Sequence, residues 1–201
     1  MRVFRSRRNT FIIVILLIIL GSALYISTRD PGPPVDPEVE HEVELFFSTE
    51  DAMYLQSETR TVAGEDFYLN VLQELIAGPQ SEELNPTIPE DSEVLGVEHE
   101  RQEERLIINF NDNWRLDHWG GSTGERLTIY SIVNTMTSLP EISRVRFLVE
   151  GREIESLAGH LDLTTDYSFS EDIVQTEKAR EINEEEYEVE VKEQEEEENS
   201  D

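Results

Sequence analysis

The sequence predicts an α+β domain in which two helices pack on one face of a small mixed β-sheet. In the middle of the chain, short segments that alternate apolar and polar residues are interrupted by two longer segments in which apolar residues recur every three or four positions. These two periods give the element order β-β-α-β-β-α-β. The folded domain is expected at residues 43–161 of the 201-residue chain, after an anchor at 1–28 and a linker at 29–42 and before a largely disordered acidic tail at 162–201.

The N-terminus has the features of a membrane anchor. Sixteen residues from Phe11 to Ile26 carry no charge, and the ten residues before them hold four arginines and no acidic residue. As a helix this run spans about 24 Å of the roughly 30 Å hydrocarbon core, so flanking residues must extend it into the interface. The arginines predict a cytoplasmic N-terminus and an extracytoplasmic domain. A cleaved signal peptide is the alternative, because Gly21 and Ala23 are spaced as in a signal peptidase site.

The composition restricts the partners of the exported part. Residues 31–180 hold 32 acidic and ten basic residues, a formal charge of −22. Such a surface repels phosphate, so we expect no nucleic-acid partner and no attraction to anionic lipid headgroups. The acidic excess and the scarcity of lysine predict a halophilic source, since the Debye length at ~1 M salt is only about 3 Å. An ordinary acidic exported protein is the alternative. The chain has no cysteine, and therefore no lipid-modified cysteine and no disulfide.

The first three elements follow a linker rich in proline. Residues 43–47 alternate apolar and polar side chains, and a second strand is expected at 54–62 after a short turn. Helical spacing of apolar residues predicts a helix over 66–77. Asp66 is placed to cap its start, and Gly78-Pro79 forces its end.

The remaining elements form a hairpin, a helix and a final strand. Ser122 and Glu125 fit a capping box, which places the start of the second helix at residue 122, and Pro140 ends the helix. Gly151 permits a turn into a short last strand. The strands of this half are expected at 94–98, 106–110, 145–149 and 152–154.

The loop at residues 111–123 holds the one cluster of residues that resembles a site. Asp112, Asp117 and His118 are residue types that bind divalent metals, and His118 is of the type that acts as a general base. No second histidine lies nearby, however, and none of these residues repeats at a ligand spacing on a helix. We therefore predict no metal, no cofactor and no catalytic residue here.

The two tryptophans of this loop allow two interpretations. In one, Trp114 and Trp119 bury their rings and fold the loop onto the domain, with Gly120-Gly121 turning the chain into the second helix. In the other, at least one ring stays partly exposed as an anchor for a partner protein, because aromatic residues dominate interface energetics. The partner-binding candidates are Trp114, His118 and Trp119.

The sequence lacks a recognisable nucleophile motif. Residues 120–124 (GGSTG) resemble a Gly-x-Ser-x-Gly elbow only superficially, because Ser122 is better explained as a helix cap. These residues do not match a phosphate-binding loop either, since no lysine follows the glycines. We therefore predict that the protein is not an enzyme.

Five segments, in this order, resemble one known family. They are LIAGP at 75–79, IPE at 88–90, GGS at 120–122, NTMTSLP at 134–140 and VRFLVEG at 145–151. Together they resemble the GerMN domain, the sporulation and spore germination module of bacterial envelope proteins. The resemblance implies an α+β fold similar to the ring-building domains of transenvelope complexes, an extracytoplasmic position, and a binding or scaffolding role without established catalytic residues. Many relatives are lipoproteins, whereas this chain has a single copy of the domain and a helical anchor.

These observations predict a membrane-anchored, extracytoplasmic interaction or scaffold module of the bacterial cell envelope. A relation to sporulation, spore germination or cell-wall processing follows from the resemblance. The expected partners are other envelope or membrane proteins, or further copies of the chain. The N-terminal helix is expected to insert into the membrane. The alternative is an envelope protein that binds or hydrolyses cell-wall material through the loop at 111–123.

Overall fold

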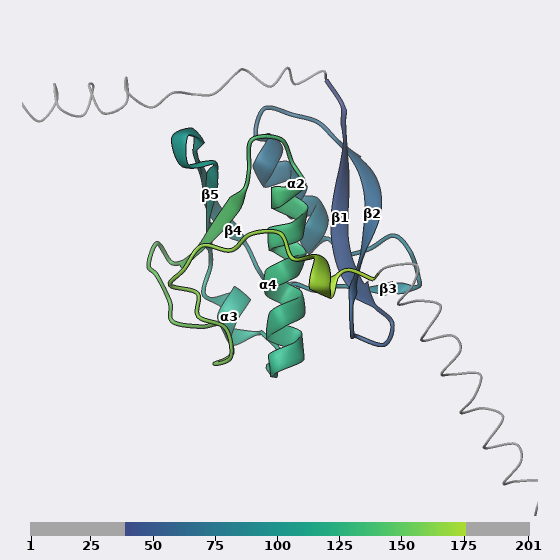
Figure 1. Cartoon of the computed structure of the whole chain (residues 1–201), viewed down its shortest axis with the longest axis vertical. Coiled ribbons are helices and arrows are strands. Elements are labelled where there is room, and N and C mark those ends of the chain that lie inside the picture. Colours follow the sequence, from purple (N-terminus) through teal and green to yellow (C-terminus); the bar gives the residue numbers. More distant parts are fainter. Residues whose placement is uncertain (1–38, 176–201) are drawn as a thin grey trace, which may run out of the picture. The chain divides into compact units, whose positions relative to one another are not determined.

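A computed structural model describes residues 39–175 of the chain, where two helices lie between two three-stranded sheets (Figure 1). Helix α2 contacts β1 and β4, while α4 contacts β1 and β6, so each helix joins one sheet to the other. The first sheet has the strand order β2-β1-β3 and the second the order β4-β5-β6. The elements are β1 (His41–Thr49), β2 (Leu55–Val62), α2 (Phe67–Ile76), β3 (Leu84–Asn85), β4 (Val94–Glu100), β5 (Arg105–Phe110), α3 (Asn113–Leu116), α4 (Ser122–Thr137) and β6 (Arg144–Val149).

The predicted α+β class and the order of the seven main elements are confirmed, but the expectation of one sheet is wrong. The strands divide into an antiparallel sheet and a mixed sheet, in which β4 and β5 pair antiparallel and β5 and β6 pair parallel. Within residues 39–175 the predicted short strand at 152–154 is also missing, because Arg152 forms only an isolated bridge with Val149 across a tight turn. The two sheets stay separate because α4 occupies the edge of β1.

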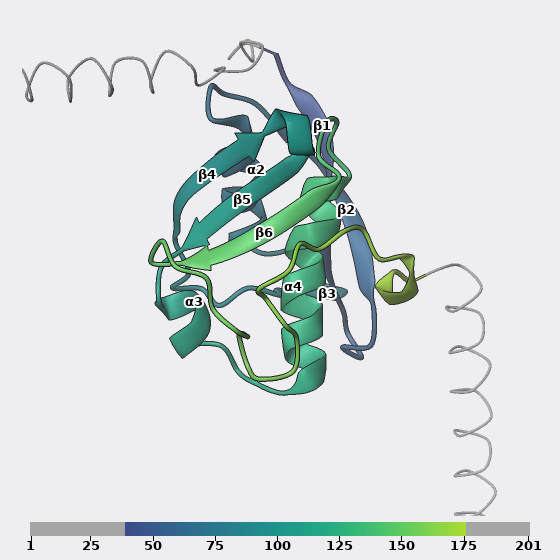
Figure 2. The ribbon, with the colours of Figure 1, turned by 60° about the vertical axis from the view of Figure 1, so that its left-hand side comes forward.

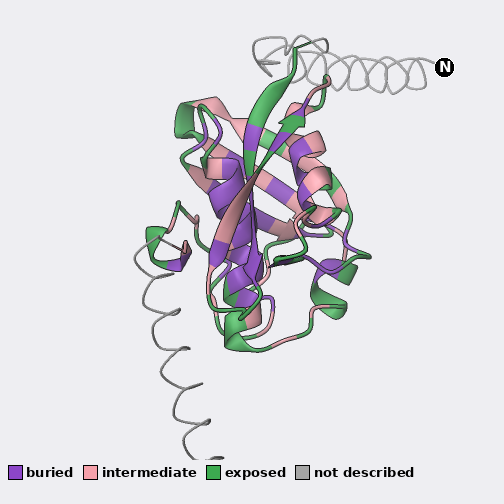
Figure 3. Ribbon diagram, turned by 90° about the vertical axis from the view of Figure 1, so that its right-hand side faces the viewer, coloured by how far each residue is buried: buried purple, intermediate pink, exposed green. Residues whose placement is uncertain are grey.

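Polar side chains on α4 take the place of a neighbouring strand along this edge. Phe46 of β1 donates its backbone N–H to Thr135 Oγ1 at 3.0 Å, and its carbonyl accepts from Ser131 Oγ at 2.6 Å. One turn earlier, Thr128 Oγ1 donates to the carbonyl of Thr87 at 2.6 Å. All three helix residues are buried, and Figure 3 shows purple, buried ribbon along most of α4. The helix is therefore enclosed on several sides rather than amphipathic, and its buried polar groups have partners.

The start of α4 differs from the predicted capping box. Gly121, with φ of 81°, is the N-cap residue, and Ser122 is the first helical residue without a capping hydrogen bond from its side chain. Glu125 is fully buried and points to another part of the chain. Its Oε1 accepts from the N–H groups of Leu157 at 2.8 Å and Ala158 at 2.9 Å, and its Oε2 accepts from His160 N–H at 2.8 Å. Glu125 therefore holds the loop after β6 instead of its own helix terminus.

The main hydrophobic core fills the space between the sheets and the helices. On β5 and β6 the buried positions alternate as the sequence predicts, and the other positions remain partly exposed. The helices contribute Val71, Leu72 and Leu75 from α2, and Ile129, Ile132, Val133 and Met136 from α4.

The folded part extends past residue 161, to which the sequence assigned its end. The C-terminal segment, residues 162–175, runs from β6 across α4 to β2 (Figure 2). Tyr167 exchanges two backbone hydrogen bonds with Val145 of β6, and Asn134 of α4 pairs through its side-chain amide with both backbone groups of Ser170. Ile173 is buried beside Phe46, Leu55 and Leu127 in a second cluster. The segment thus closes over the helix and one end of β2.

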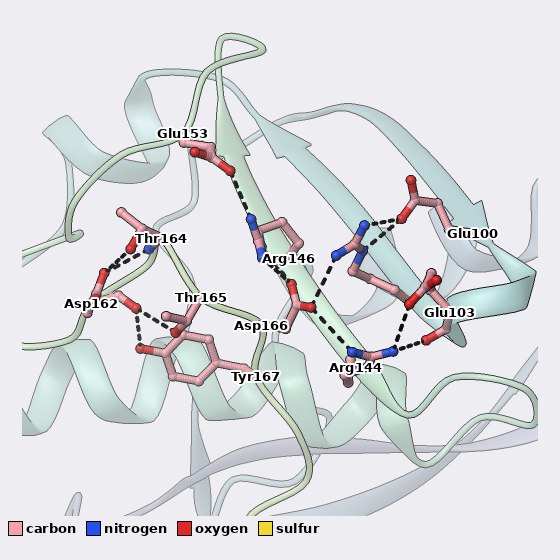
Figure 4. A network of polar contacts seen from close by, with 11 residues as sticks. Glu100, Glu103, Arg144, Arg146, Glu153, Asp162, Thr164, Thr165, Asp166 and Tyr167 are labelled. Atoms are coloured by element: carbon pink, nitrogen blue, oxygen red, sulfur yellow. Dashed lines mark hydrogen bonds and ion pairs between the residues drawn. The ribbon is translucent and has the colours of Figure 1, made fainter.

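An ion-pair network fixes the first part of this segment. Asp166, whose side chain is 15% exposed, lies between Arg144 and Arg146 of β6 (Figure 4). Arg146 approaches its Oδ1 at 2.6 Å, and Arg105 of β5 approaches Oδ2 at 3.2 Å. Burial of Asp166 opposes ionisation, but the hydrogen bonds and charges of Arg146 and Arg105 outweigh it, so the pKa of this carboxyl is lowered.

Three sequence predictions fall on residues outside the described range. They are the anchor at 11–26, most of the linker at 29–42, and the acidic tail from residue 176 onward. Within residues 39–175, no helix has the length and apolar character needed to cross a membrane.

Candidate functional site

The two tryptophans of the loop between β5 and α4 have opposite environments. Trp114, on the short helix α3, is fully buried between Phe110 and Phe147, with ring centroids 4.4 Å and 5.4 Å away and interplanar angles of 18° and 27°. A partner cannot contact this buried ring, so Trp114 is not a partner-binding residue. The other interpretation holds for Trp114: its ring packs the loop onto the domain. Trp119 is 56% exposed and remains the accessible aromatic residue of this loop.

The indole of Trp119 is held in place on the surface. One face stacks on His118, with centroids 5.3 Å apart and an interplanar angle of 21°. Its Nε1 edge lies over Gly124 in the first turn of α4, where an added Cβ would stand 2.9 Å from Nε1 and 3.0 Å from Cδ1. Position 124 therefore leaves room for the ring only because it has no side chain. An exposed ring with two such supports is oriented before any partner arrives.

His118 is itself fixed by hydrogen bonds that define its protonation. Thr128 Oγ1 donates its proton to the carbonyl of Thr87, so this oxygen accepts from His118 Nε2–H at 3.1 Å. His118 Nδ1 accepts from the backbone N–H of Gly120 at 3.0 Å. Burial lowers the pKa of His118, and the carboxylate of Glu125 acts in the opposite direction with smaller effect. The imidazole is thus the neutral Nε2–H tautomer, and it joins the exposed indole to the core of the domain.

The exposed apolar surface of this region is small. Leu116, at the end of α3, is 63% exposed and precedes Trp119 by three residues. Between them and α4, Gly120 and Gly121 both have positive φ, and no heavy atom stands within 4 Å of an added Cβ at either position. We call residues 116–121 the Trp119 loop. It combines an oriented aromatic ring, an exposed leucine and a backbone that a ligand can approach closely.

The aspartates of this region do not assemble with His118 into a metal site. Asp112 pairs with Arg115 at 3.1 Å, while His118 is committed to Thr128 and Gly120. Within residues 39–175 no group of three or more histidine, aspartate or glutamate residues is placed to hold a metal ion. The arrangement is suited to holding a surface aromatic ring in a fixed orientation.

Sequence reasoning missed two supporting residues of the Trp119 loop. Gly124 lies inside a helix, where glycine lowers helix stability by about 1 kcal/mol relative to alanine. A glycine at such a position indicates that another group packs closely against it, and this was the signal available in the sequence. Thr128, four positions further along α4, shows no signal in the sequence because its role depends on the carbonyl of Thr87.

The structure is thus an α+β domain whose most distinctive surface feature is a supported tryptophan, and the sequence comparisons define its family. The family model named Germane, described as "Sporulation and spore germination", matches residues 44–155. This match covers more than half of the chain, so the protein belongs to the Germane family. The resemblance to GerMN domains expected from the sequence is thereby confirmed. A search of curated proteins finds no match.

Two solved structures of GerMN domains agree with this assignment at the level of the fold. The tandem GerMN domains of the sporulation protein GerM from Bacillus subtilis match at 17% identity and a TM-score of 0.53, over 65% of this chain and 46% of that one. The first GerMN domain of the same protein matches at 16% identity and a TM-score of 0.51, over 67% of this chain and 98% of that one. A candidate lipoprotein from Clostridium perfringens matches at 26% identity and a TM-score of 0.47, over 67% and 90% of the two chains. This chain therefore spans about half of the tandem structure and nearly all of the single domain.

Proposed function

We propose that the protein is a membrane-anchored, extracytoplasmic binding module that holds another component of the bacterial cell envelope during sporulation, germination or cell-wall processing. The family assignment supports the biological setting. The apolar run at 11–26 and the arginines before it support the anchor and its orientation. In this proposal the domain acts by binding, as a scaffold, and the linker at 29–42 separates it from the membrane.

The observation that carries the binding role is the supported indole of Trp119. Trp119 is 56% exposed, and its contacts with His118 and Gly124 add little to the core packing of the domain. Oriented, exposed aromatic residues are the usual anchors of recognition surfaces. Envelope proteins, including further copies of the chain, and wall material are the two partner classes that the sequence indicated.

Two experiments test this function. Protease added to intact protoplasts should degrade the part of the chain after Asp30, and protection of that part would contradict the extracytoplasmic position.

In a deletion strain of the source organism, the wild-type chain should restore sporulation or germination. A Trp119→Ala chain present at the same level should not. Leu157, which is buried and distant in sequence from the loop, offers a Leu157→Met control that keeps the core volume and the Trp119 loop unchanged. Normal sporulation and germination with Trp119→Ala would contradict the proposed site.

A further inference from the structure

The proposed function leaves the chemistry of the partner open, and three features of the Trp119 loop restrict it. They are the free face of the indole, the small apolar area around it, and the strong negative charge of the domain. Each restricts the ligand in a different way.

The first feature is a flat aromatic face turned to solvent. Because His118 covers the other face of the Trp119 ring, the exposed face is the one available to a ligand. The π-face of an indole carries partial negative charge, and it attracts groups with slightly positive C–H bonds or a cation. A pyranose ring with equatorial hydroxyls presents such C–H bonds together on one side, over an area about equal to that of an indole.

The second feature is the size of the exposed apolar area. Leu116 and Trp119 together expose on the order of 200 Å², since a whole aromatic side chain buries only about 150–250 Å². A standard protein interface buries about 800 Å² on each partner, with more than half of it apolar. The exposed apolar area of the loop is therefore only a small part of what such an interface buries. It matches one or two sugar rings, with Gly120 and Gly121 allowing close approach to the backbone.

The third feature is charge. Residues 39–175 hold 29 acidic residues and eight arginines, a formal charge of −21. Six of these arginines are engaged in ion pairs with carboxylates. The field of the domain therefore repels polyanions such as teichoic acid, nucleic acid and anionic lipid surfaces. A neutral glycan meets no such repulsion, and the exposed carboxylate of Asp117 can accept hydrogen bonds from its hydroxyl groups.

From these features we infer that the Trp119 loop is a carbohydrate-binding platform, on which the free face of Trp119 stacks against a sugar ring of the neutral glycan strand of the cell wall. This inference rests on the proposed function and names the partner's chemistry. His118 and Gly124 are positioning residues, because they orient the indole and do not touch the sugar.

Binding is tested with the full-length chain purified in detergent. The probes are a β-1,4-linked tetramer of N-acetylglucosamine and purified peptidoglycan freed of teichoic acid. The chain has two tryptophans, of which Trp114 is fully buried, so acrylamide quenching of fluorescence reports mainly Trp119. The tetramer should protect the fluorescence from acrylamide, and the chain should sediment with the peptidoglycan.

Matched variants locate the contact. Trp119→Ala should weaken binding at least about tenfold, which corresponds to ~1.4 kcal/mol, and Trp119→Phe should retain part of it because a smaller ring remains. Gly124→Ala should also weaken binding, since its new methyl group displaces the intact indole. Met53→Ala is the matched control, because it removes an apolar side chain of similar exposure (59%) from the turn between β1 and β2, outside the Trp119 loop, and should leave glycan binding unchanged.

The results that overturn the inference are distinct from those that overturn the proposed function. No binding to either probe at millimolar sugar, or equal binding by the wild-type and Trp119→Ala chains, would overturn the carbohydrate platform. A protein partner is indicated, and the platform is refuted, if neither probe binds while Trp119→Ala and Leu116→Ala both fail to complement the deletion strain. In that case the proposed binding function stands. If Trp119→Ala complements fully, Trp119 is not the site through which the proposed function acts, whatever the glycan result.

Discussion

Replacing Glu125 by glutamine tests whether the loop after β6 depends on a single buried carboxylate. Glu125 is fully buried, and its two oxygens accept three backbone N–H groups from residues 157–160. Glutamine keeps the volume of the side chain and one oxygen. Its amide –NH₂ replaces the other oxygen, so a donor would face the N–H of His160 where an acceptor is required.

The expected cost follows from the hydrogen bonds. A buried donor without an acceptor costs about 1–3 kcal/mol. The bonds to Leu157 and Ala158 lose their charge assistance, and the removed cost of burying a charge offsets part of that loss. We therefore expect Glu125→Gln to lower the free energy of unfolding by about 2 kcal/mol, or ~8 °C in Tm for a domain of this size. Glu125→Ala leaves three donors without an acceptor and should cost about 4 kcal/mol.

Thermal and urea unfolding followed by circular dichroism measure this cost, using the chain from residue 39 onward. Hydrogen exchange should show that the amides of Leu157, Ala158 and His160 lose protection in both variants, while those of β5 keep theirs. Ser122→Ala is the matched control, because the sequence assigned the helix cap to Ser122 and the structure shows no capping bond. A change below ~0.5 kcal/mol for Glu125→Gln, or a loss of 1 kcal/mol or more for Ser122→Ala, would refute the reasoning and favour the capping box.

Three further predictions concern the C-terminal segment and the charge. A chain that ends at residue 161 should unfold at a clearly lower temperature than one that ends at 175, because it lacks buried Leu163 and Ile173; equal melting temperatures would contradict the packing of this segment. The folded-state pKa of Asp166 is lowered, so the stability that its carboxylate contributes is present above its unfolded pKa of about 3.9 and is lost as pH falls through the folded value. Asp166→Asn should therefore flatten the decline in Tm between about pH 5 and 2, and an unchanged decline would exclude Asp166 as its source. Finally, Tm should rise between ~0.01 M and ~1 M potassium chloride as the Debye length falls from about 30 Å to about 3 Å, with an unchanged far-ultraviolet spectrum; a flat or falling Tm would remove the support for a halophilic source.

The periodic part of the fold could be predicted from the sequence because its signals are local. The alternation over 106–110 and 145–149 and the helical spacing over 66–77 describe a buried face, and the structure places those faces in the core. The number of sheets could not be predicted in this way. It depends on α4 lying along β1, and that placement rests on hydrogen bonds between Phe46 and residues more than 80 positions later.

The end of the domain was missed for a related reason. Leu163, Tyr167 and Ile173 are spaced irregularly among polar residues, so no period marks them as part of the folded domain. Leu163 belongs to the main core, Tyr167 forms a bridge with β6, and Ile173 lies in the second cluster, so their positions follow from the path of the chain over α4.

The candidate site was predicted in part. The sequence singled out Trp114, His118 and Trp119 but could not tell which ring was buried, because both tryptophans lie in the same polar loop. Trp114 is the buried ring because Phe110 and Phe147 enclose it, whereas the indole of Trp119 lies on the surface against Gly124.

The contact between α4 and β1 also affects how the protein avoids aggregation. A strand edge with free backbone groups is a template on which a second chain can add a strand, and β1 pairs with β3 only at Ser48 and Thr49. Ser131 and Thr135 satisfy the backbone of Phe46 and keep that edge closed. Apolar residues at these two positions would suit a buried helix face, yet they would leave Phe46 without partners and favour intermolecular pairing. The hydroxyl groups of Ser131 and Thr135 therefore close the edge of β1 at Phe46, where free backbone groups would otherwise invite the addition of a strand.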